Sequence, residues 1–272
     1  RLPPERVTGL ATVRDVLAAC DASAPAPGSA PGSAPGGPAR DWLAPRTRLE
    51  RAVGAAALSL VRISLRRRWG LTVARAAAPT DRGPLLLCPN HASYLDPMAL
   101  AAAAPRDMLR RTRWAASASH LFRRRWMGAF WRCLRVFPVD ETAPEAALAL
   151  ARRALARGEI VVWFPEGWRS PDGALGPFQS GVGRLIADTG VAVAPVAIHG
   201  TFEAWPRWRR LPGRGRISVA FGAPVPADRL AGPPAAAAPA AIAAALRARV
   251  QALLDATRPA DGGAPEARDT AA

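Results

Sequence analysis

The chain has 272 residues, half of them hydrophobic, and a formal net charge of +16. This composition excludes a chain that is disordered throughout, and it allows one domain of about 200 residues with a sizeable core. All of the basic residues are arginine. Their excess favours an anionic partner, such as a lipid surface, a phosphorylated substrate or nucleic acid.

The cysteines and the apolar stretches indicate the cellular compartment and whether the chain can cross a membrane. Cys20, Cys88 and Cys133 are widely spaced and form no Cys-x-x-Cys pair. This predicts neither a disulfide framework nor a metal site and is typical of the reducing cytosol. The longest strongly apolar stretch, residues 52–61, is too short to span about 30 Å of hydrocarbon. We therefore expect a cytoplasmic protein, peripheral on the inner face of the cell membrane.

The two ends of the chain differ in composition from its middle. Residues 12–17 resemble the last helix of an acyl carrier domain, so residues 1–20 are expected to be the end of such a domain upstream. Residues 21–45 are rich in Ala, Pro, Gly and Ser, which is typical of a linker, and a disordered tail is expected over 258–272. The folded domain is then expected over residues 46–257.

Within this domain, hydrophobic periodicity and turn residues predict strands that alternate with helices. Residues 48–68 alternate apolar and basic side chains at helical spacing, and Asp96-Pro97 is expected to open a helix as its N-cap and first position. The other segments expected are strands at 85–88, 114–117, 134–139, 159–164, 191–198 and 216–221, and helices at 98–104, 144–157, 181–189 and 240–256. This alternation predicts an α/β fold.

A histidine and a carboxylate stand five residues apart where the strand at 85–88 gives way to a helix. These are His91 and Asp96, and loops at strand ends commonly carry reactive groups. A carboxylate bonded to an imidazole fixes its tautomer and stabilises the imidazolium that forms when the ring takes a proton. The pair is a candidate general base acting on an alcohol. A structural histidine and a helix-capping aspartate would have the same sequence.

A second polar turn follows the strand expected at 159–164. Residues 164–170 read Phe-Pro-Glu-Gly-Trp-Arg-Ser, and Glu166 and Arg169 emerge together. A guanidinium can bind a phosphate through two parallel hydrogen bonds. A surface turn with an i,i+3 ion pair is the alternative interpretation. Residues 193–198 are a core strand with an unusual proline, Pro195.

In order and spacing, these segments resemble the glycerolipid acyltransferase family, which includes the 1-acylglycerol-3-phosphate acyltransferases. The family's Asn-His-x4-Asp block is matched by Asn90, His91 and Asp96. Its Phe-Pro-Glu-Gly-Thr-Arg-Ser block is matched by residues 164–170, with Trp168 in place of threonine. The proline-containing strand also matches, and the resemblance covers roughly residues 45–256.

The resemblance implies a mixed β-sheet flanked by helices, like that of the glycerol-phosphate acyltransferases, and an enzyme without a cofactor. An acyl thioester, either acyl-CoA or acyl carrier protein, would donate a fatty acyl group to a hydroxyl of a lysophospholipid or glycerol phosphate. His91 would be the general base, oriented by Asp96. The residues implied in acceptor binding are Asn90, Glu166, Gly167 and Arg169.

One departure from the family concerns the acceptor. The family commonly has an Asp-Arg pair whose arginine helps to hold the acceptor phosphate, whereas this chain has Asp140-Glu141. A carboxylate repels a phosphate. Either the nearby Arg135 compensates, or the acceptor carries a different head group.

Three stretches combine arginine with large apolar side chains, as the headgroup zone of a membrane favours: residues 66–69, 122–131 and 205–210. We expect them to contact an anionic membrane surface, unless their aromatic rings pack in the core. No nucleic-acid-binding motif is recognised, so nucleic acid is not an expected partner. The alternative to an enzyme is a catalytically weak membrane-binding module of the same fold within a larger multidomain protein. A hydrolase is disfavoured because the chain has no Gly-x-Ser-x-Gly motif.

Overall fold

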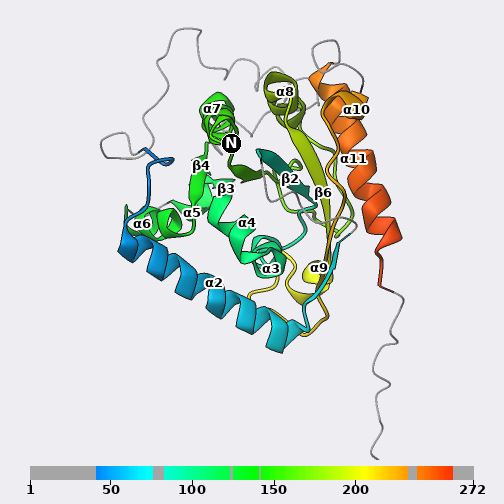
Figure 1. Cartoon of the computed structure of the whole chain (residues 1–272). Coiled ribbons are helices and arrows are strands. Elements are labelled where there is room, and N and C mark those ends of the chain that lie inside the picture. Colours follow the sequence, from blue (N-terminus) through cyan, green and yellow to red (C-terminus); the bar gives the residue numbers. More distant parts are fainter. Residues whose placement is uncertain (1–40, 76–82, 123–124, 141, 232–237, 260–272) are drawn as a thin grey trace, which may run out of the picture. The chain divides into compact units, whose positions relative to one another are not determined.

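The computed structural model describes residues 41–75, 83–122, 125–140, 142–231 and 238–259. These residues form a seven-stranded sheet with helices on both faces (Figure 1). The segments expected as a carrier-domain end, a linker and a tail lie wholly or largely outside the described ranges, and their assignment stays a prediction.

The sheet is mixed, which confirms the expected fold class. Its strands are β1 (Thr72–Arg75), β2 (Leu85–Pro89), β3 (Thr112–Ser117), β4 (Val136–Val139), β5 (Ile160–Val162), β6 (Ala192–His199) and β7 (Ser218–Phe221). They lie in the order β1-β7-β6-β2-β5-β3-β4. Only the β6–β7 pair is antiparallel among the described strands, and the other neighbours run parallel. The central strands are therefore buried on both faces, as parallel strands usually are.

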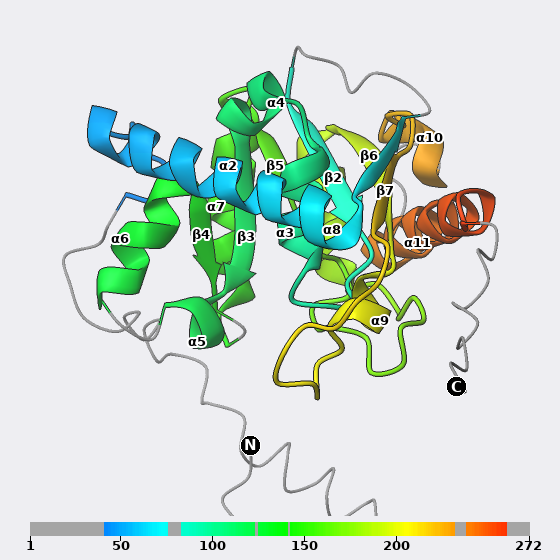
Figure 2. The ribbon, with the colours of Figure 1, turned by 90° about the horizontal axis from the view of Figure 1, so that it is seen from below.

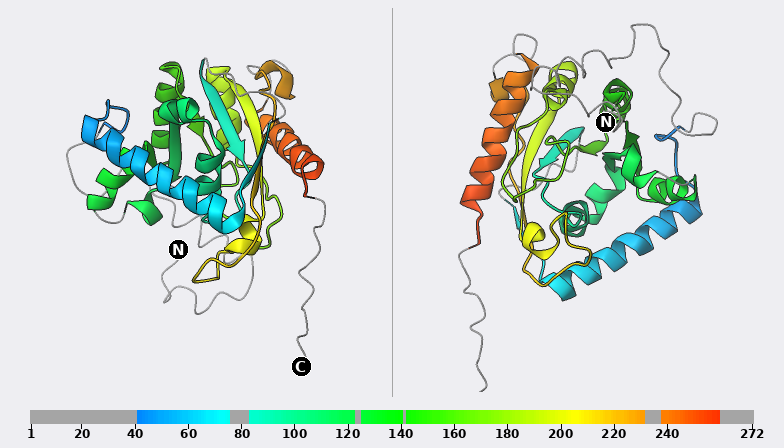
Figure 3. Two further views of the ribbon diagram at one scale, coloured as in Figure 1. Left: turned by 60° about the horizontal axis from the view of Figure 1, so that its bottom comes forward. Right: turned by 180° about the vertical axis from the view of Figure 1, so that it is seen from behind.

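The helices cover the two faces of the sheet. They are α2 (Arg48–Trp69), α3 (Asp96–Ala103), α4 (Arg106–Arg111), α5 (Ala118–Leu121), α6 (Arg125–Cys133), α7 (Pro144–Ala156), α8 (Ser180–Thr189), α9 (Thr201–Ala204), α10 (Asp228–Ala231) and α11 (Pro239–Ala256). Side chains alternate across a strand, so Leu85 and Leu87 of β2 pack with α2, α3 and α4. Leu86 and Cys88 pack with α7, α8 and α11 on the other face (Figures 1 and 3).

The long helix α2 has strong signals at both ends. Thr47 and Glu50 form a reciprocal capping box at its start, and Gly70 ends it in the left-handed conformation with a φ of 53°. Leu65 and Trp69 bury its inner face. Of the helices in the described ranges, α2 included, none combines the length and apolarity needed to cross a membrane.

Two expectations about strands and caps are corrected. The strand expected from residue 134 begins only at Val136, because Arg135 has a φ of 63° and breaks the extended backbone. The expected N-cap Asp96 is instead the first residue of α3, and Leu95 is the N-cap. The edge strand β1 was not expected.

Pro195 fits inside β6 because the strand changes partner there. Beyond it, β6 pairs with β7 from Val196 onward, whereas Val193 pairs with Val225. The Gly222 amide donates to the Pro195 carbonyl at 2.9 Å. A Cβ at Gly222 would lie 2.7 Å from the proline ring, so glycine permits this close crossing.

Candidate active site

The candidate site lies where the parallel neighbours β5, β2 and β6 end, so that their following loops meet at one edge of the sheet (Figure 2). Asn90, directly after β2, extends the strand pairing with its side chain. Its Nδ2 donates to the Ile198 carbonyl at 3.0 Å, and its Oδ1 accepts the Ile198 amide at 2.8 Å. The Asn90 amide is thereby occupied by the backbone of β6. It holds in register the start of the loop at residues 90–95, which bears the candidate base His91 and is called the catalytic loop below.

His91 and Asp96 form a bonded pair. His91 Nδ1 lies 2.8 Å from Asp96 Oδ2, and the same oxygen accepts the amides of Ala92 at 2.6 Å and Ser93 at 2.7 Å. Because a carboxylate only accepts hydrogen bonds, this contact assigns the imidazole proton to Nδ1 and leaves the Nε2 lone pair free to take a proton. The His91 side chain is 18% exposed and that of Asp96 fully buried, so solutes reach the ring but not the carboxylate.

Glu166 connects the catalytic loop to the second motif. Its Oε1 accepts the His91 amide at 2.6 Å, and its Oε2 accepts the Gly176 amide at 2.9 Å. The Ser170 amide donates to the His91 carbonyl at 2.8 Å. Burial raises the pKa of Glu166, against the lowering effect of these two amides. The Glu166 carboxylate therefore positions backbone on both sides of the site.

Arg169 has a guanidinium that is positioned but not fully paired. It lies over the ring of Tyr94 at 3.5 Å, and Tyr94 in turn contacts Trp205 with ring centroids 5.5 Å apart. Its Nη1 is buried and has no hydrogen-bond partner among the described residues. A buried donor without a partner is costly, so this nitrogen is an unsatisfied donor at the candidate site.

Gly167 and Trp168, which separate Glu166 from Arg169 in the sequence, are both exposed. Gly167 has a φ of 77°, in the region that favours glycine. Trp168 is 57% exposed, so the large ring in place of threonine needs no room in the core.

Sequence reasoning missed how Ser93, Tyr94 and Trp205 support the site. Ser93 Oγ donates to the Trp205 carbonyl at 2.7 Å and accepts the Leu95 amide at 3.1 Å. Ser93 and Tyr94 lie inside the Asn-His-x4-Asp block and could have been examined on that ground. Trp205 carries no sequence signal for this role, since it lies more than a hundred residues away.

The suggestion that Arg135 could compensate at the acceptor phosphate is wrong. Its guanidinium bonds to Glu159 and donates to the Thr112 carbonyl at 3.0 Å. Arg113 shares the same Glu159 carboxylate, so this is a structural ion cluster where β3, β4 and β5 begin. Glu141, the residue that departs from the family, lies outside the described residues.

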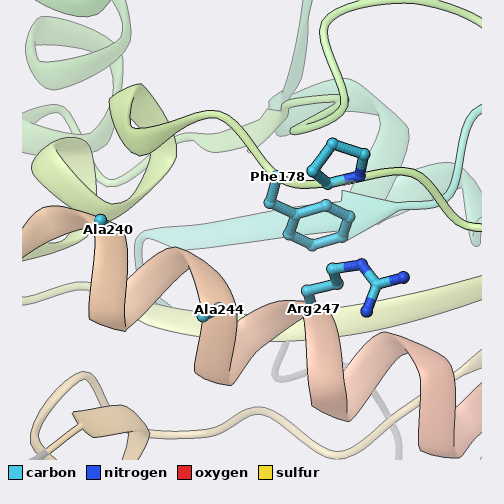
Figure 4. Close-up of a pocket in the computed structure, with 5 residues that line it drawn as sticks. Phe178, Ala240, Ala244 and Arg247 are labelled. Atoms are coloured by element: carbon cyan, nitrogen blue, oxygen red, sulfur yellow. The ribbon is translucent and has the colours of Figure 1, made fainter.

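A surface hollow lies beside the segment that Glu166 holds. Figure 4 shows Phe178 and Arg247 facing one another across it, with Ala240 and Ala244 along α11. Arg247 donates to the carbonyls of Leu175 at 2.7 Å and Gly176 at 2.8 Å. The hollow contains neither His91 nor Asp96, and its arginine braces the segment whose amide holds Glu166.

Comparison with known proteins is consistent with this arrangement. A family model described as Acyltransferase matches residues 71–199, which include both motifs and β6. The fold and the paired histidine and aspartate thus define an acyltransferase domain. Residues 71–199 are therefore similar to the domain that this family model describes, and the similar proteins include several named 1-acyl-sn-glycerol-3-phosphate acyltransferase.

Three such relatives show how far the similarity extends. The chloroplastic protein BAT2 of Brassica napus is 30% identical over 131 residues, which cover 47% of this chain and 36% of that one. The Pseudomonas aeruginosa protein is 36% identical over 92 residues, 32% of this chain and 35% of that one. The Bacillus subtilis protein is 26% identical over 149 residues, 54% and 69% of the two chains. The chain thus matches only about a third of the length of the Brassica relative.

A solved structure shares the fold. The 1-acyl-sn-glycerophosphate acyltransferase PlsC of Thermotoga maritima superposes with a TM-score of 0.55 at 22% identity, covering 77% of this chain and 76% of that one. This likeness supports the mixed α/β architecture.

Proposed function

We propose that this chain transfers a fatty acyl group from an acyl thioester to a hydroxyl of a lysophospholipid or glycerol phosphate. The observation that carries the proposal is the bonded pair of His91 and Asp96, held by Glu166 against the turn that bears Arg169. The relatives' names point to the same reaction class.

The chemistry needs one proton acceptor and no covalent intermediate on the protein. His91 Nε2 takes the proton of the acceptor hydroxyl as its oxygen attacks the thioester carbonyl. The carbon–sulfur bond then breaks, and the leaving thiolate takes the proton back from the imidazolium. Asp96 stabilises that imidazolium from the buried side, because its Oδ2 already lies 2.8 Å from Nδ1.

Acceptor recognition is assigned to Arg169 and to the exposed Gly167 backbone. The unpartnered Nη1 of Arg169 favours an acceptor that carries a phosphate. The side chains of Asn90 and Glu166 are bonded to backbone groups, so we assign them to positioning rather than to substrate contact. The donor is proposed to be acyl-CoA or an acyl carrier protein, without a further cofactor.

The place of action is proposed to be the inner face of the cell membrane. The acceptor and the fatty thioester both partition there, and the excess of arginine favours anionic lipid.

The test is His91→Ala, with His199→Ala as a matched control in β6. Both variants should fold, judged by circular dichroism. Only His91→Ala should abolish thiol release from an acyl thioester in the presence of lysolipid. A panel of lysolipids, each with acyl-CoA and acyl carrier donors, then defines the substrates. A folded His91→Ala protein with wild-type turnover contradicts the mechanism, and a wild type inactive on the whole panel favours the binding-module alternative.

A further inference from the structure

Two of the arginine-rich stretches, separate in sequence, meet in space. The basic loop, which we define as residues 205–216, follows α9 and contacts the carboxyl end of α2. Trp69 Nε1 donates to the Gly213 carbonyl at 3.0 Å, and the Ile217 amide donates to the Trp69 carbonyl at 3.0 Å. In Figure 3, right, the end of α2 lies beside this loop.

The joined surface is strongly cationic. Its exposed arginines are Arg66, Arg67, Arg68, Arg207, Arg209, Arg210, Arg214 and Arg216. The basic loop itself contains no acidic residue. Within the described part of the chain, none of these arginines forms an ion pair with a carboxylate. Charges left uncompensated in this way favour an anionic partner.

Large apolar side chains project from the middle of these arginines. Trp208 is 63% exposed and Leu211 is 75% exposed. The loop that presents them is internally bonded, because Trp205 Nε1 donates to the Arg209 carbonyl at 2.9 Å and the Gly213 amide donates to the Ala204 carbonyl at 2.6 Å. An ordered loop that exposes tryptophan and leucine among arginines suits the headgroup zone of a bilayer.

The basic loop is also attached to the catalytic loop. Its first residue, Trp205, accepts the Ser93 hydroxyl at 2.7 Å and contacts the Tyr94 ring. Beyond that contact, a Cβ at Gly173 would lie 3.0 Å from Phe202, which packs on Trp208. The segment after β5 therefore lies beside α9 and the basic loop, and Figure 2 shows these loops projecting on the same side.

We propose that the basic loop and the end of α2 dock this chain on an anionic lipid bilayer, with Trp208 and Leu211 inserted among the headgroups. Docking by this surface would bring the edge of the sheet that bears His91 to the lipid interface. The inference deepens the proposed function by naming the surface through which the acceptor is reached.

The test measures binding to vesicles of phosphatidylcholine mixed with phosphatidylglycerol, and of phosphatidylcholine alone, by co-sedimentation. One variant combines Arg207→Gln, Arg210→Gln and Arg214→Gln. The matched control removes the same charge elsewhere, with Arg106→Gln, Arg110→Gln and Arg229→Gln. Each arginine near an anionic surface strengthens partitioning about fivefold, so the loop variant should bind the mixed vesicles about a hundredfold more weakly. The control variant should bind as the wild type does.

A second variant, Trp208→Ser with Leu211→Ser, should also weaken binding, and its loss should persist at high salt because insertion is apolar. If both loop variants bind like the wild type, or the control variant loses as much, the docking surface is wrong. If a DNA duplex displaces wild-type protein from the mixed vesicles at equal phosphate concentration, the surface is a nucleic-acid surface instead.

Turnover separates this inference from the proposed function. With a water-soluble short-chain acceptor the loop variants should keep wild-type rates, whereas on vesicle-borne lysolipid they should be slow. Loop-dependent binding without acyl transfer to any acceptor would uphold docking and reject the enzyme. If the loop variants transfer acyl groups to vesicle-borne lysolipid at the wild-type rate, the enzyme is upheld and docking through the basic loop is rejected.

Discussion

Replacing Asp96 by asparagine tests the proposed catalytic pair of His91 and Asp96 with almost no change of shape. In the wild type, Asp96 Oδ2 lies 2.8 Å from His91 Nδ1. At that separation and an effective dielectric constant of about 20, full charges attract by about 6 kcal/mol. Because both charges are spread over several atoms, we expect about half of this to stabilise the imidazolium. The loss of about 3 kcal/mol should lower kcat by about a hundredfold.

The fold should survive Asp96→Asn. The amide oxygen can still accept from Ala92 and Ser93, and its nitrogen would replace Oδ1, which is buried without a partner among the described residues. We expect the free energy of unfolding to change by at most about 1–3 kcal/mol. Thiol release at saturating substrate gives kcat, and urea unfolding gives stability. Asp188→Asn, at a surface pair, is the control. A folded Asp96→Asn protein with a kcat close to that of wild type would refute the assigned role.

Three further predictions follow from the packing and the charges. Gly183→Ala should lower Tm, because its Cβ would lie 1.8 Å from a carbonyl at the start of α11. The control is Gly181→Ala in the same helix, whose Cβ meets nothing within 4 Å. This control should leave the free energy of unfolding unchanged or raise it by up to about 1 kcal/mol. Burial lowers the pKa of His199 below its ordinary 6.5, so folding favours the neutral imidazole. As the pH falls below 6.5, the wild type should therefore lose more free energy of unfolding than His199→Gln, as measured by urea titrations. Tyr94→Leu should raise KM for a phosphate-bearing acceptor more than it lowers kcat, because Arg169 loses the ring beneath it. Tyr94→Phe keeps the ring and should restore KM. Equal KM values for the wild type and both variants would argue against a role of the ring in positioning Arg169.

One contact of the site, between His91 and Asp96, could be predicted from the sequence because it depends on short-range geometry. A histidine five residues before an aspartate, across a strand–helix junction, has few ways to place its ring, and the observed bond follows. The family resemblance placed residues 164–170 at the same site, but it implied that Glu166 binds the acceptor and did not predict its bond to the His91 amide. The strand order and the antiparallel β6–β7 pair likewise came only from the structure.

The predictions that were wrong or absent failed because they depend on contacts between residues that are distant in the sequence or on the direction of a side chain. Asp96 carries the residue type of an N-cap, but its carboxylate turns back to the catalytic loop, and Leu95 takes the cap position without a side-chain bond. Arg135 was near the right place in sequence, yet its guanidinium bonds to Glu159, a half-buried residue that directly precedes β5. The meeting of residues 66–69 with 205–216 has no sequence signature, because tertiary contact alone creates it.

The two hydrogen bonds that Glu166 accepts, from the His91 and Gly176 amides, make position 166 sensitive to substitution, whereas position 168 lies exposed at the surface. Any shift of this carboxylate would move the His91 amide and the Gly176 amide together, so a substitution at position 166 would disturb the proposed proton acceptor. Position 168, two residues on, is exposed and can carry threonine in the family or tryptophan here. The exposed side chain at position 168 therefore lies where a substitution need not move the Glu166 carboxylate or the two amides that it holds.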